Sequence, residues 1–325
     1  MRKILITVPL IALLLLAAAI AFGGPSEPAP MGSINDPFRS IDYNDLTAIQ
    51  RFAARDGERL AYRAYAPQGT PRGSVVLLHG SSASSVSMHV LAKALAEAGV
   101  AAYALDVRGH GASGRKGQIA HVGQLDDDLE DFMRRVQPGR PATLAGFSAG
   151  GGFALRVAAG ERQALFDHYL LLAPFISQDA PTYRADSGGW VRVGIPRIVA
   201  LSLLDAVGVH AFEALPVTRF ALNDKAKDML TPAYGYALAT NYRPRADWRA
   251  SIRGAHQPMR LLAGQQDEAF HAERYAAVFQ AEGKDVAATL LPGVGHAGLT
   301  LQPQAVQAVV AAVKSLQAGP SVALR

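Results

Sequence analysis

The sequence predicts an α/β fold, built on a parallel sheet that helices cover on both faces. Short, continuously apolar runs alternate with helical patterns over residues 74–175, and the alternation resumes at residue 257. A strand that reads as an unbroken apolar run is typical of a parallel sheet, because both of its faces are buried. The chain of 325 residues is long enough for a large core, and no repeat of roughly 20–50 residues divides it. We therefore expect one core that carries an insertion.

The composition argues against several classes of protein. Half of the residues are apolar and 18% are charged, which is not the composition of a disordered chain. The net charge of +5 is mild and no basic run is interleaved with aromatic residues, so we expect no nucleic-acid partner. The chain contains no cysteine, so it forms no disulfide and carries no lipidated thiol.

Residues 1–24 are interpreted as a signal peptide or a membrane anchor. Two basic residues precede an uncharged stretch, residues 4–22, through which the chain would associate with a membrane. The nineteen residues of this stretch favour an uncleaved anchor, whereas Ala19 and Ala21 offer a small-x-small cleavage site. In either case the basic residues stay in the cytoplasm and the folded part lies outside it, in the periplasm or at the cell surface if the protein is bacterial.

A linker over residues 25–45, rich in Pro, Gly and Ser, follows this segment. The folded part then opens with an antiparallel hairpin, because Asp56-Gly57 separates two alternating runs in "RFAARDGERLAYRAYAP" (51–67). After this pair the sequence predicts strands at 74–80, 100–106, 141–147 and 168–175. The helices between them are expected from about Ser85 to Gly99, over 124–136, and from Ser148 to near Gly160.

Residues 176–255 interrupt this alternation. Prolines and aromatic residues punctuate the stretch and no core strand is evident, so we expect an inserted cap of short helices. The alternation resumes with a strand at 257–267, a helix at about 269–282, a strand at 285–296 and a last helix at about 302–317. On this interpretation residues 46–175 and 256–318 form one α/β core, and residues 176–255 form the cap.

Ser148 is the candidate nucleophile. Ligands of an open α/β sheet gather at the carboxyl ends of the strands, and Ser148 directly follows the apolar run "TLAGF" and precedes an alanine-rich helical pattern. Gly146 and Gly150 are the small residues that a sharp strand-to-helix turn needs around a strained serine. A chain with 31 glycines could use such residues for packing alone, so the strand-to-helix context is what favours a nucleophile.

His296 and Asp267 follow later strands and complete a Ser–Asp–His order. A serine hydroxyl needs a base to take its proton, and the base needs a carboxylate that fixes its tautomer. Only His271 and His296 follow Asp267, and His271 falls within a helical pattern, so we expect His296 to be the base. Glu268 is the immediate rival of Asp267, and either acid could instead cap a helix.

Two backbone amides are expected to stabilise the developing oxyanion. One belongs to Ala149, directly after the nucleophile, and the other to Ser81, in the loop after "VVLLHG". The ring of His79 is expected to hold that loop in shape. Three polar side chains of "LDVRGHGAS" are likewise expected to shape a loop rather than to act in catalysis: Asp106, Arg108 and His110.

The sequence indicates no metal site and no cofactor. The acidic run "DDDLED" (126–131) has the spacing of a solvated helix face and no histidine partner, so we expect no metal ion there.

Taken together, these segments resemble the α/β-hydrolase superfamily, and more narrowly its monoacylglycerol lipase and lysophospholipase-like serine hydrolases. The resemblance runs from about residue 48 to 317 and rests on five segments in family order: "LLHGSS", "DVRGHGASGRKG", "GFSAGG", "GQQDE" and "GVGHAG". It implies an eight-stranded, mostly parallel sheet with an antiparallel second strand, and a cap over the site. It also implies that Ser148, Asp267 and His296 are the nucleophile, the acid and the base.

The predicted function is hydrolysis of carboxylic esters, acylglycerol or lysophospholipid-like, through an acyl-enzyme. A peptidase of the same fold is the alternative enzyme, and it would need cap carboxylates positioned for a free amine, such as Glu213 or Asp224. A membrane-tethered binding protein that retains the fold without turnover is the alternative from another class.

Overall fold

The computed structural model describes residues 2–31, 36–185 and 189–319. Its centre is an eight-stranded sheet with the spatial order β1 (Ile49–Ala53), β2 (Arg59–Tyr65), β4 (Ala101–Leu105), β3 (Ser74–Leu78), β5 (Ala142–Phe147), β6 (His168–Leu172), β10 (Met259–Gly264) and β11 (Ala287–Leu291). The pairs from β4 to β11 are parallel, and β2 is antiparallel to both of its neighbours. The predicted α/β fold with a mostly parallel sheet is confirmed.

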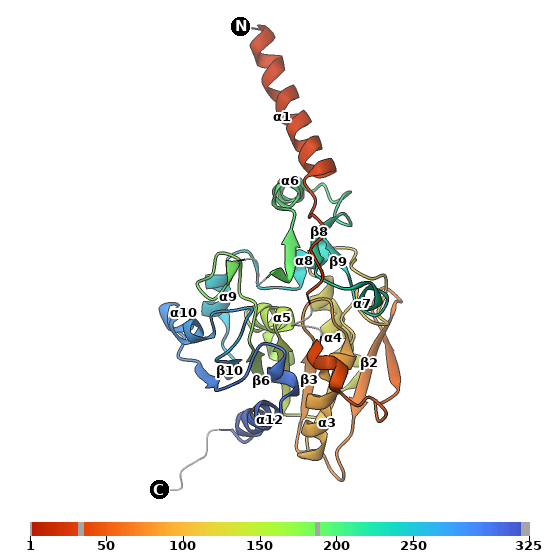
Figure 1. The fold of residues 1–325 in the computed structure, drawn as a ribbon, viewed down its shortest axis with the longest axis vertical. Helices are drawn as coiled ribbons and strands as arrows, with labels where there is room; N and C mark the ends of the chain where they lie inside the picture. Colours follow the sequence, from red (N-terminus) through yellow and green to blue (C-terminus); the bar gives the residue numbers. More distant parts are fainter. Residues whose placement is uncertain (1, 32–35, 186–188, 320–325) are drawn as a thin grey trace.

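The strand order determines which helices cover which face. The helix α3 (His89–Glu97) connects β3 to β4 towards one edge of the sheet, whereas α4 (Gln124–Val136) and α5 (Ala149–Ala158) connect strands that advance towards the other edge. Because such crossovers are right-handed, α3 lies on one face and α4 and α5 lie on the opposite face. The last helix, α12 (Pro303–Gln317), packs beside α3 (Figure 1).

The core lies on both sides of the central strands. The side chains of residues 75–78 in β3 and of residues 170–172 in β6 have no exposed surface. Each such side chain contributes about 1.5–3 kcal/mol when it is fully buried. Burial on both faces is why these strands read as unbroken apolar runs in the sequence.

The hairpin predicted at 51–67 is present as β1 and β2, with Phe52 opposite Leu60. Gly57 occupies the turn at φ +87°, a conformation that glycine adopts without steric cost. The first two strands of the chain therefore pair as an antiparallel hairpin at one edge of the sheet.

The helix predicted at about 269–282 begins later than expected. The chain first forms the 3₁₀ turn η5 (Ala272–Arg274), and only then α10 (Tyr275–Ala281). In the preceding turn, the amides of Ala269 and Phe270 each donate to Oδ1 of Asp267 at 2.8 Å. Because this side chain holds the two amides in a turn, the helix starts after it.

Between β6 and β10, the cap (residues 176–255) contains strands as well as helices. Three antiparallel strands, β7 (Val191–Val193), β8 (Pro216–Phe220) and β9 (Ala233–Gly235), accompany the helices α6 (Ile195–Ala206), α7 (Asp224–Met229), α8 (Tyr236–Asn241) and α9 (Trp248–Gly254). In Figure 1, β8 and β9 stand above the large sheet and α6 lies at the outer end. The expectation of a cap made only of short helices is incomplete, because strands of three to five residues are too short to give a recognisable alternation.

The N-terminal segment forms the helix α1 (Arg2–Phe22), which projects away from the body (Figure 1). Its last turn contacts the cap, where the guanidinium of Arg197 on α6 donates to the carbonyls of Ile20 at 2.7 Å and Ala21 at 2.9 Å. Basic side chains commonly satisfy the last carbonyls of a helix in this way. Among the described residues, no helix combines the length and the apolar character needed to cross a membrane.

Candidate active site

Ser148 lies at a sharp turn between β5 and α5, with φ +55° and ψ −117°. Glycines on either side make this turn possible. A Cβ atom on Gly146 would lie 2.1 Å from the carbonyl oxygen of Gly150, and one on Gly150 would lie 2.5 Å from the carbonyl oxygen of His79. The strained backbone thus raises one hydroxyl above the carboxyl edge of the sheet.

The structure brings Ser148, His296 and Asp267 together in one hydrogen-bonded chain. Nε2 of His296 lies 3.0 Å from Oγ of Ser148, and Nδ1 of the same ring lies 2.8 Å from Oδ2 of Asp267. All three side chains are buried. They come from the loops after β5, β10 and β11, which meet because parallel strands end at the same edge of the sheet.

The two rivals named from the sequence lie elsewhere. Glu268 contacts the same loop, but its Oε2 accepts from the backbone amide of His296 at 2.8 Å and not from the ring. Nδ1 of His271 lies 3.2 Å from Oε1 of Glu273, and no hydrogen bond joins His271 to Ser148. The geometry therefore favours Asp267 and His296 over these alternatives.

The charge state of His296 depends on two opposing effects. Burial disfavours the imidazolium and alone would lower the pKa of His296. The charge and hydrogen bond of Asp267, together with a smaller contribution from Glu268, outweigh burial and raise the pKa of His296 above its ordinary value. This carboxylate can therefore stabilise a positive charge that forms on the ring during a reaction.

Two backbone amides near Ser148 are placed to donate hydrogen bonds to a negatively charged oxygen. The amide nitrogens of Ala149 and Ser81 donate no hydrogen bond to any residue that the structure describes, and both residues line the cavity that contains Ser148. Ala149 is also the first residue of α5, where backbone N–H groups have no intrahelical partner. Both amides predicted as oxyanion donors are therefore free to bind a ligand oxygen.

The loop that carries Ser81 is fastened to the cap by residues that the sequence did not single out for this role. The hydroxyl oxygen of Tyr234 accepts from the amide of Ser82 at 2.6 Å, and Oγ of Ser82 donates to the carbonyl of Thr231 at 2.7 Å. The hydroxyl of Tyr242 donates to the carbonyl of His79. The only sequence signal was the density of cap aromatics, which is equally consistent with ordinary core packing.

The polar residues expected to shape loops make structural hydrogen bonds. Nδ1 of His79 lies 2.8 Å from the carbonyl oxygen of Gly80. Asp106 accepts from the amides of Ser85 at 2.7 Å and Ala112 at 2.8 Å.

Arg108 and His110 also make such contacts. Nη2 of Arg108 lies 2.7 Å from Oδ1 of Asp128, and Nε2 of His110 lies 2.6 Å from the hydroxyl oxygen of Tyr234. Burial lowers the pKa of His110 well below its ordinary value, so this ring is neutral.

The interpretation of residues 126–131 as a solvated helix face is wrong. Asp126, Asp128 and Asp131 are buried. Each of them faces an arginine from another element. Asp126 lies 3.1 Å from Arg156, and an arginine also lies 2.7 Å from Asp128 and another 3.1 Å from Asp131. The amphipathic spacing was correct, but these carboxylates face guanidinium groups rather than water.

Ser148 opens into a cavity of about 1060 Å³ between the core and the cap. Most of its lining is apolar, and it includes Phe38, Ile41, Phe175, Val193, Ile198 and Val217. Three basic residues also line it, Arg39, Lys225 and Arg243. Arg243 lies 5.7 Å from the ring centroid of Phe175 and donates to Oε1 of Gln178 at 3.3 Å. The cavity is therefore suited to a ligand with a long apolar part and a polar group.

The sheet, the serine at its turn and the cap define a protein of the α/β-hydrolase fold. The comparison with protein families identifies the particular group: residues 69–300 match the Hydrolase_4 family, described as serine aminopeptidase, S33. This match covers well over half of the chain, and the chain belongs to this family.

Two of the relatives that this chain resembles are lipases. The chain is 37% identical over 123 residues to a monoacylglycerol lipase of Mycolicibacterium smegmatis, covering 35% of this chain and 43% of the relative. It is 30% identical over 168 residues to the monoglyceride lipase of Homo sapiens, covering 49% of this chain and 54% of the relative. The aligned part thus spans about half the length of these relatives.

Solved structures confirm the fold. A soluble variant of the monoglyceride lipase from Saccharomyces cerevisiae in complex with a substrate analogue matches with a TM-score of 0.62 and 19% identity, over 84% of this chain and 94% of that one. A structure described as a membrane phospholipase A, a bacterial virulence factor, matches with a TM-score of 0.60 and 17% identity, over 97% of this chain and 99% of that one.

Proposed function

We propose that the protein is a serine hydrolase that cleaves carboxylic esters, acylglycerol or lysophospholipid-like, through an acyl-enzyme. The observation that carries this proposal is the hydrogen-bonded chain from Ser148 through His296 to Asp267 at the wall of a large, mostly apolar cavity. The similarity to monoacylglycerol and monoglyceride lipases supports the same reaction class.

The proposed reaction proceeds in two halves. Nε2 of His296 accepts the proton of Ser148 while Oγ attacks the ester carbonyl carbon, and the amides of Ser81 and Ala149 bind the developing oxyanion. The tetrahedral intermediate collapses, the C–O bond breaks, and His296 delivers the proton to the leaving alcohol. A water molecule, deprotonated by the same ring, then attacks the acyl-enzyme and releases the carboxylic acid and free Ser148. Asp267 holds the ring and stabilises its positive charge.

The lining of the cavity supports substrates with a long acyl chain. Apolar side chains of both core and cap surround the space beside Ser148. Binding of an acyl chain there is favoured by about 25 cal/mol for each Å² of apolar surface that it buries. The guanidinium of Arg243 is the feature that could accommodate an anionic head group, as in a lysophospholipid.

The direct test is labelling with a fluorophosphonate probe followed by turnover of matched esters. We expect the native chain to bind the probe and Ser148→Ala to lose it. We also expect turnover of monoacylglycerol or lysophospholipid with a long acyl chain to exceed that of a short-chain ester. Probe labelling of Ser148→Ala equal to the native chain would refute the nucleophile, and labelling without turnover would favour the binding-protein alternative.

The two cap carboxylates named for the peptidase alternative do not lie at the cavity that contains Ser148. Neither Glu213 nor Asp224 lines the cavity, and the side chain of Asp224 is fully exposed. A free amine at Ser148 would therefore meet neither of these carboxylates. Aminoacyl p-nitroanilides compared with p-nitrophenyl esters distinguish the two activities, and faster turnover of the anilides would overturn the ester assignment.

We also propose that the folded part acts outside the cytoplasm after export. The proposal rests on the two basic residues before the uncharged stretch at 4–22 and on the small residues at Ala19 and Ala21. Fractionation of a producing cell and the intact mass of the recovered protein test it. A full-length cytoplasmic chain would contradict it.

A further inference from the structure

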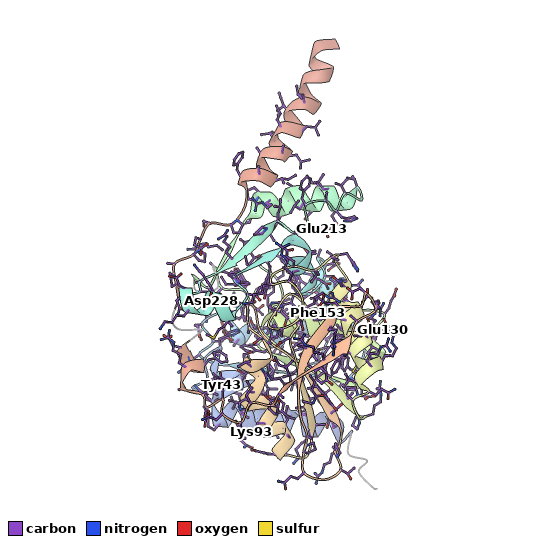
Figure 2. All side chains as sticks on the ribbon, turned by 90° about the vertical axis from the view of Figure 1, so that its right-hand side faces the viewer. Tyr43, Lys93, Glu130, Phe153, Glu213 and Asp228 are labelled. Atoms are coloured by element: carbon purple, nitrogen blue, oxygen red, sulfur yellow. The ribbon has the colours of Figure 1, made fainter. Side chains whose placement is uncertain are left out.

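We propose that three cap residues, Asp205, His210 and Glu213, form a binding site for one divalent transition-metal ion of the zinc class. The site lies where α6 ends and the chain turns towards β8, and Glu213 is seen beneath α6 in Figure 2. None of the three residues lines the cavity that contains Ser148. The proposal is therefore independent of the proposed hydrolase function.

The geometry of the cluster is the first argument. Nδ1 of His210 lies 3.1 Å from Oδ1 of Asp205 and 2.7 Å from Oε1 of Glu213. The three candidate ligand atoms lie within 4.8 Å of one another. Ligand atoms around a tetrahedral zinc ion, at bond lengths of about 2.0–2.2 Å, are separated by about 3.3 Å. Small side-chain movements would therefore admit a metal ion between these three ligand atoms.

An unpartnered oxygen is the second, independent argument. Glu213 is only 6% exposed, and its Oε2 makes no hydrogen bond within the described part of the chain. The carboxylate already faces the cluster, because Oε1 contacts His210. A buried carboxylate oxygen without a partner is costly, and a cation held by the same carboxylate offsets that cost.

The charges of the cluster favour a divalent ion. Over the described ranges, no arginine or lysine forms an ion pair with either carboxylate. With a neutral imidazole the set carries two negative charges, which a divalent cation neutralises. One imidazole nitrogen beside two carboxylate oxygens suits zinc and its neighbours better than calcium or magnesium, which prefer oxygen ligands alone. The side chains of Asp205 and His210 are 37% and 58% exposed, which leaves access for water as a further ligand.

The bound ion would tie consecutive parts of the cap together. Asp205 lies at the end of α6, and the chain then reverses at Gly208, which has φ +78°. The carbonyl of Glu213 accepts from the amide of Ala237 in α8 at 3.2 Å. The ion therefore links α6, which contributes Ile198 to the cavity wall, to the part of the cap that α8 supports. Its proposed role is to stabilise the cap.

The test is zinc binding to the full chain, purified without a histidine tag and dialysed against a chelator. We expect calorimetry to give one zinc ion per chain, and thermal unfolding to shift to higher temperature with zinc but not with magnesium. Asp205→Asn and His210→Gln should each weaken zinc affinity at least tenfold. His271→Gln is the matched control, because among the described residues His271 has only one carboxylate within 4 Å, that of Glu273.

The outcomes separate a metal site from a cluster that holds only a proton. No stoichiometric zinc binding by the native chain, or equal affinity in His210→Gln, would overturn the proposal. If a variant fails to fold, cobalt binding by the native chain decides. Visible bands of four- or five-coordinate cobalt at one equivalent support the site, and the weak spectrum of hydrated cobalt refutes it. Neither measurement depends on ester turnover.

Discussion

The hydroxyl oxygen of Tyr234, in the cap strand β9, lies 2.6 Å from the amide nitrogen of Ser82, in the loop that follows β3. Ser82 has φ +67°, a backbone region that disfavours serine. Nε2 of the neutral His110 ring lies 2.6 Å from the same hydroxyl and can accept its proton. A contact from the cap thus restrains the loop that carries Ser81.

Tyr234→Phe should lower kcat by about tenfold, which corresponds to about 1.4 kcal/mol, and leave KM nearly unchanged. The substitution leaves the buried amide of Ser82 without its acceptor, so the loop with the proposed oxyanion donor becomes less well held. Tyr236→Phe is the matched control, because its hydroxyl contacts Oγ of Ser202 within the cap. Steady-state kinetics on one ester measures both variants, and an equal loss in the two would count against the positioning role.

Replacement of the two neighbouring acids should have very different effects on turnover. Asp267→Asn removes the negative charge beside Nδ1 of His296 and is expected to lower kcat by about 10³–10⁴-fold. Glu268→Gln replaces the acceptor of a backbone amide and removes a smaller contribution to the pKa of His296, so it should cost less than about tenfold. If Glu268→Gln were the more damaging change, Glu268 would be the acid.

The pH dependence of kcat/KM should show an acidic limb set by His296. The proposed base must be neutral, and the raised pKa of His296 means that activity falls as the pH drops below a value higher than the ordinary one, about 6.5. In Asp267→Asn the opposing effect of burial remains, so the limb should move to lower pH. An acidic limb that stays in place in this variant would contradict the assignment.

The free energy of unfolding should also depend on the charge of His296, but this contribution is greatest at low pH, where activity is lowest. Because the pKa of His296 is raised in the folded protein, its stabilising contribution is fully present below the pKa of the unfolded chain, about 6.5. The contribution is lost as the pH rises through the folded pKa. Urea unfolding of Ser148→Ala and its double variant with His296→Gln, measured on both sides of that range, isolates this contribution.

Arg108→Met should destabilise the fold by about 3–5 kcal/mol. Arg108 and Asp128 are both largely buried, and burial raises the pKa of Asp128 against the opposing effect of Arg108. Removal of the cation leaves the carboxylate without its main partner. Arg135→Met on the same helix as Asp128 replaces an exposed arginine and should change the free energy of unfolding by less than about 0.5 kcal/mol. Similar losses of stability in both variants would show that the buried ion pair contributes no more to the free energy of unfolding than an exposed arginine does.

Arg243→Met should change substrate preference more than overall activity. The guanidinium lines the cavity beside Phe175, where it can pair with an anionic head group. We expect kcat/KM for a lysophospholipid to fall at least tenfold relative to a monoacylglycerol of the same chain length. A preference unchanged from the native chain would argue for neutral acylglycerols as the substrates.

The sequence was sufficient for the parts of the fold and candidate site that follow from the strand order. Ser148, Asp267 and His296 could be selected because each follows a predicted strand, and the loops after parallel strands meet at one edge. Local turn chemistry also located the hairpin at Gly57.

Contacts between distant segments could not be read in the same way. The pairing of Tyr234 with Ser82 joins residues 152 positions apart, and no local pattern encodes it. The spacing of Asp126 and Asp128 indicated a polar helix face, but not that arginines from other elements cover it. The cap strands were missed because β7 and β9 have three residues each.

Because Arg197 binds the last turn of α1, removal of this helix by a leader peptidase would change the surface at the start of α6. Cleavage after Ala21 would remove the carbonyls of Ile20 and Ala21, and the guanidinium would keep only its contact with the carbonyl of Pro216 at 2.7 Å. A solvated positive charge would then lie at the start of α6, beside a newly formed amino terminus. If this cleavage takes place, the two forms of the chain would display different electrostatic surfaces to anionic lipid, although Ser148, Asp267 and His296 are the same in both.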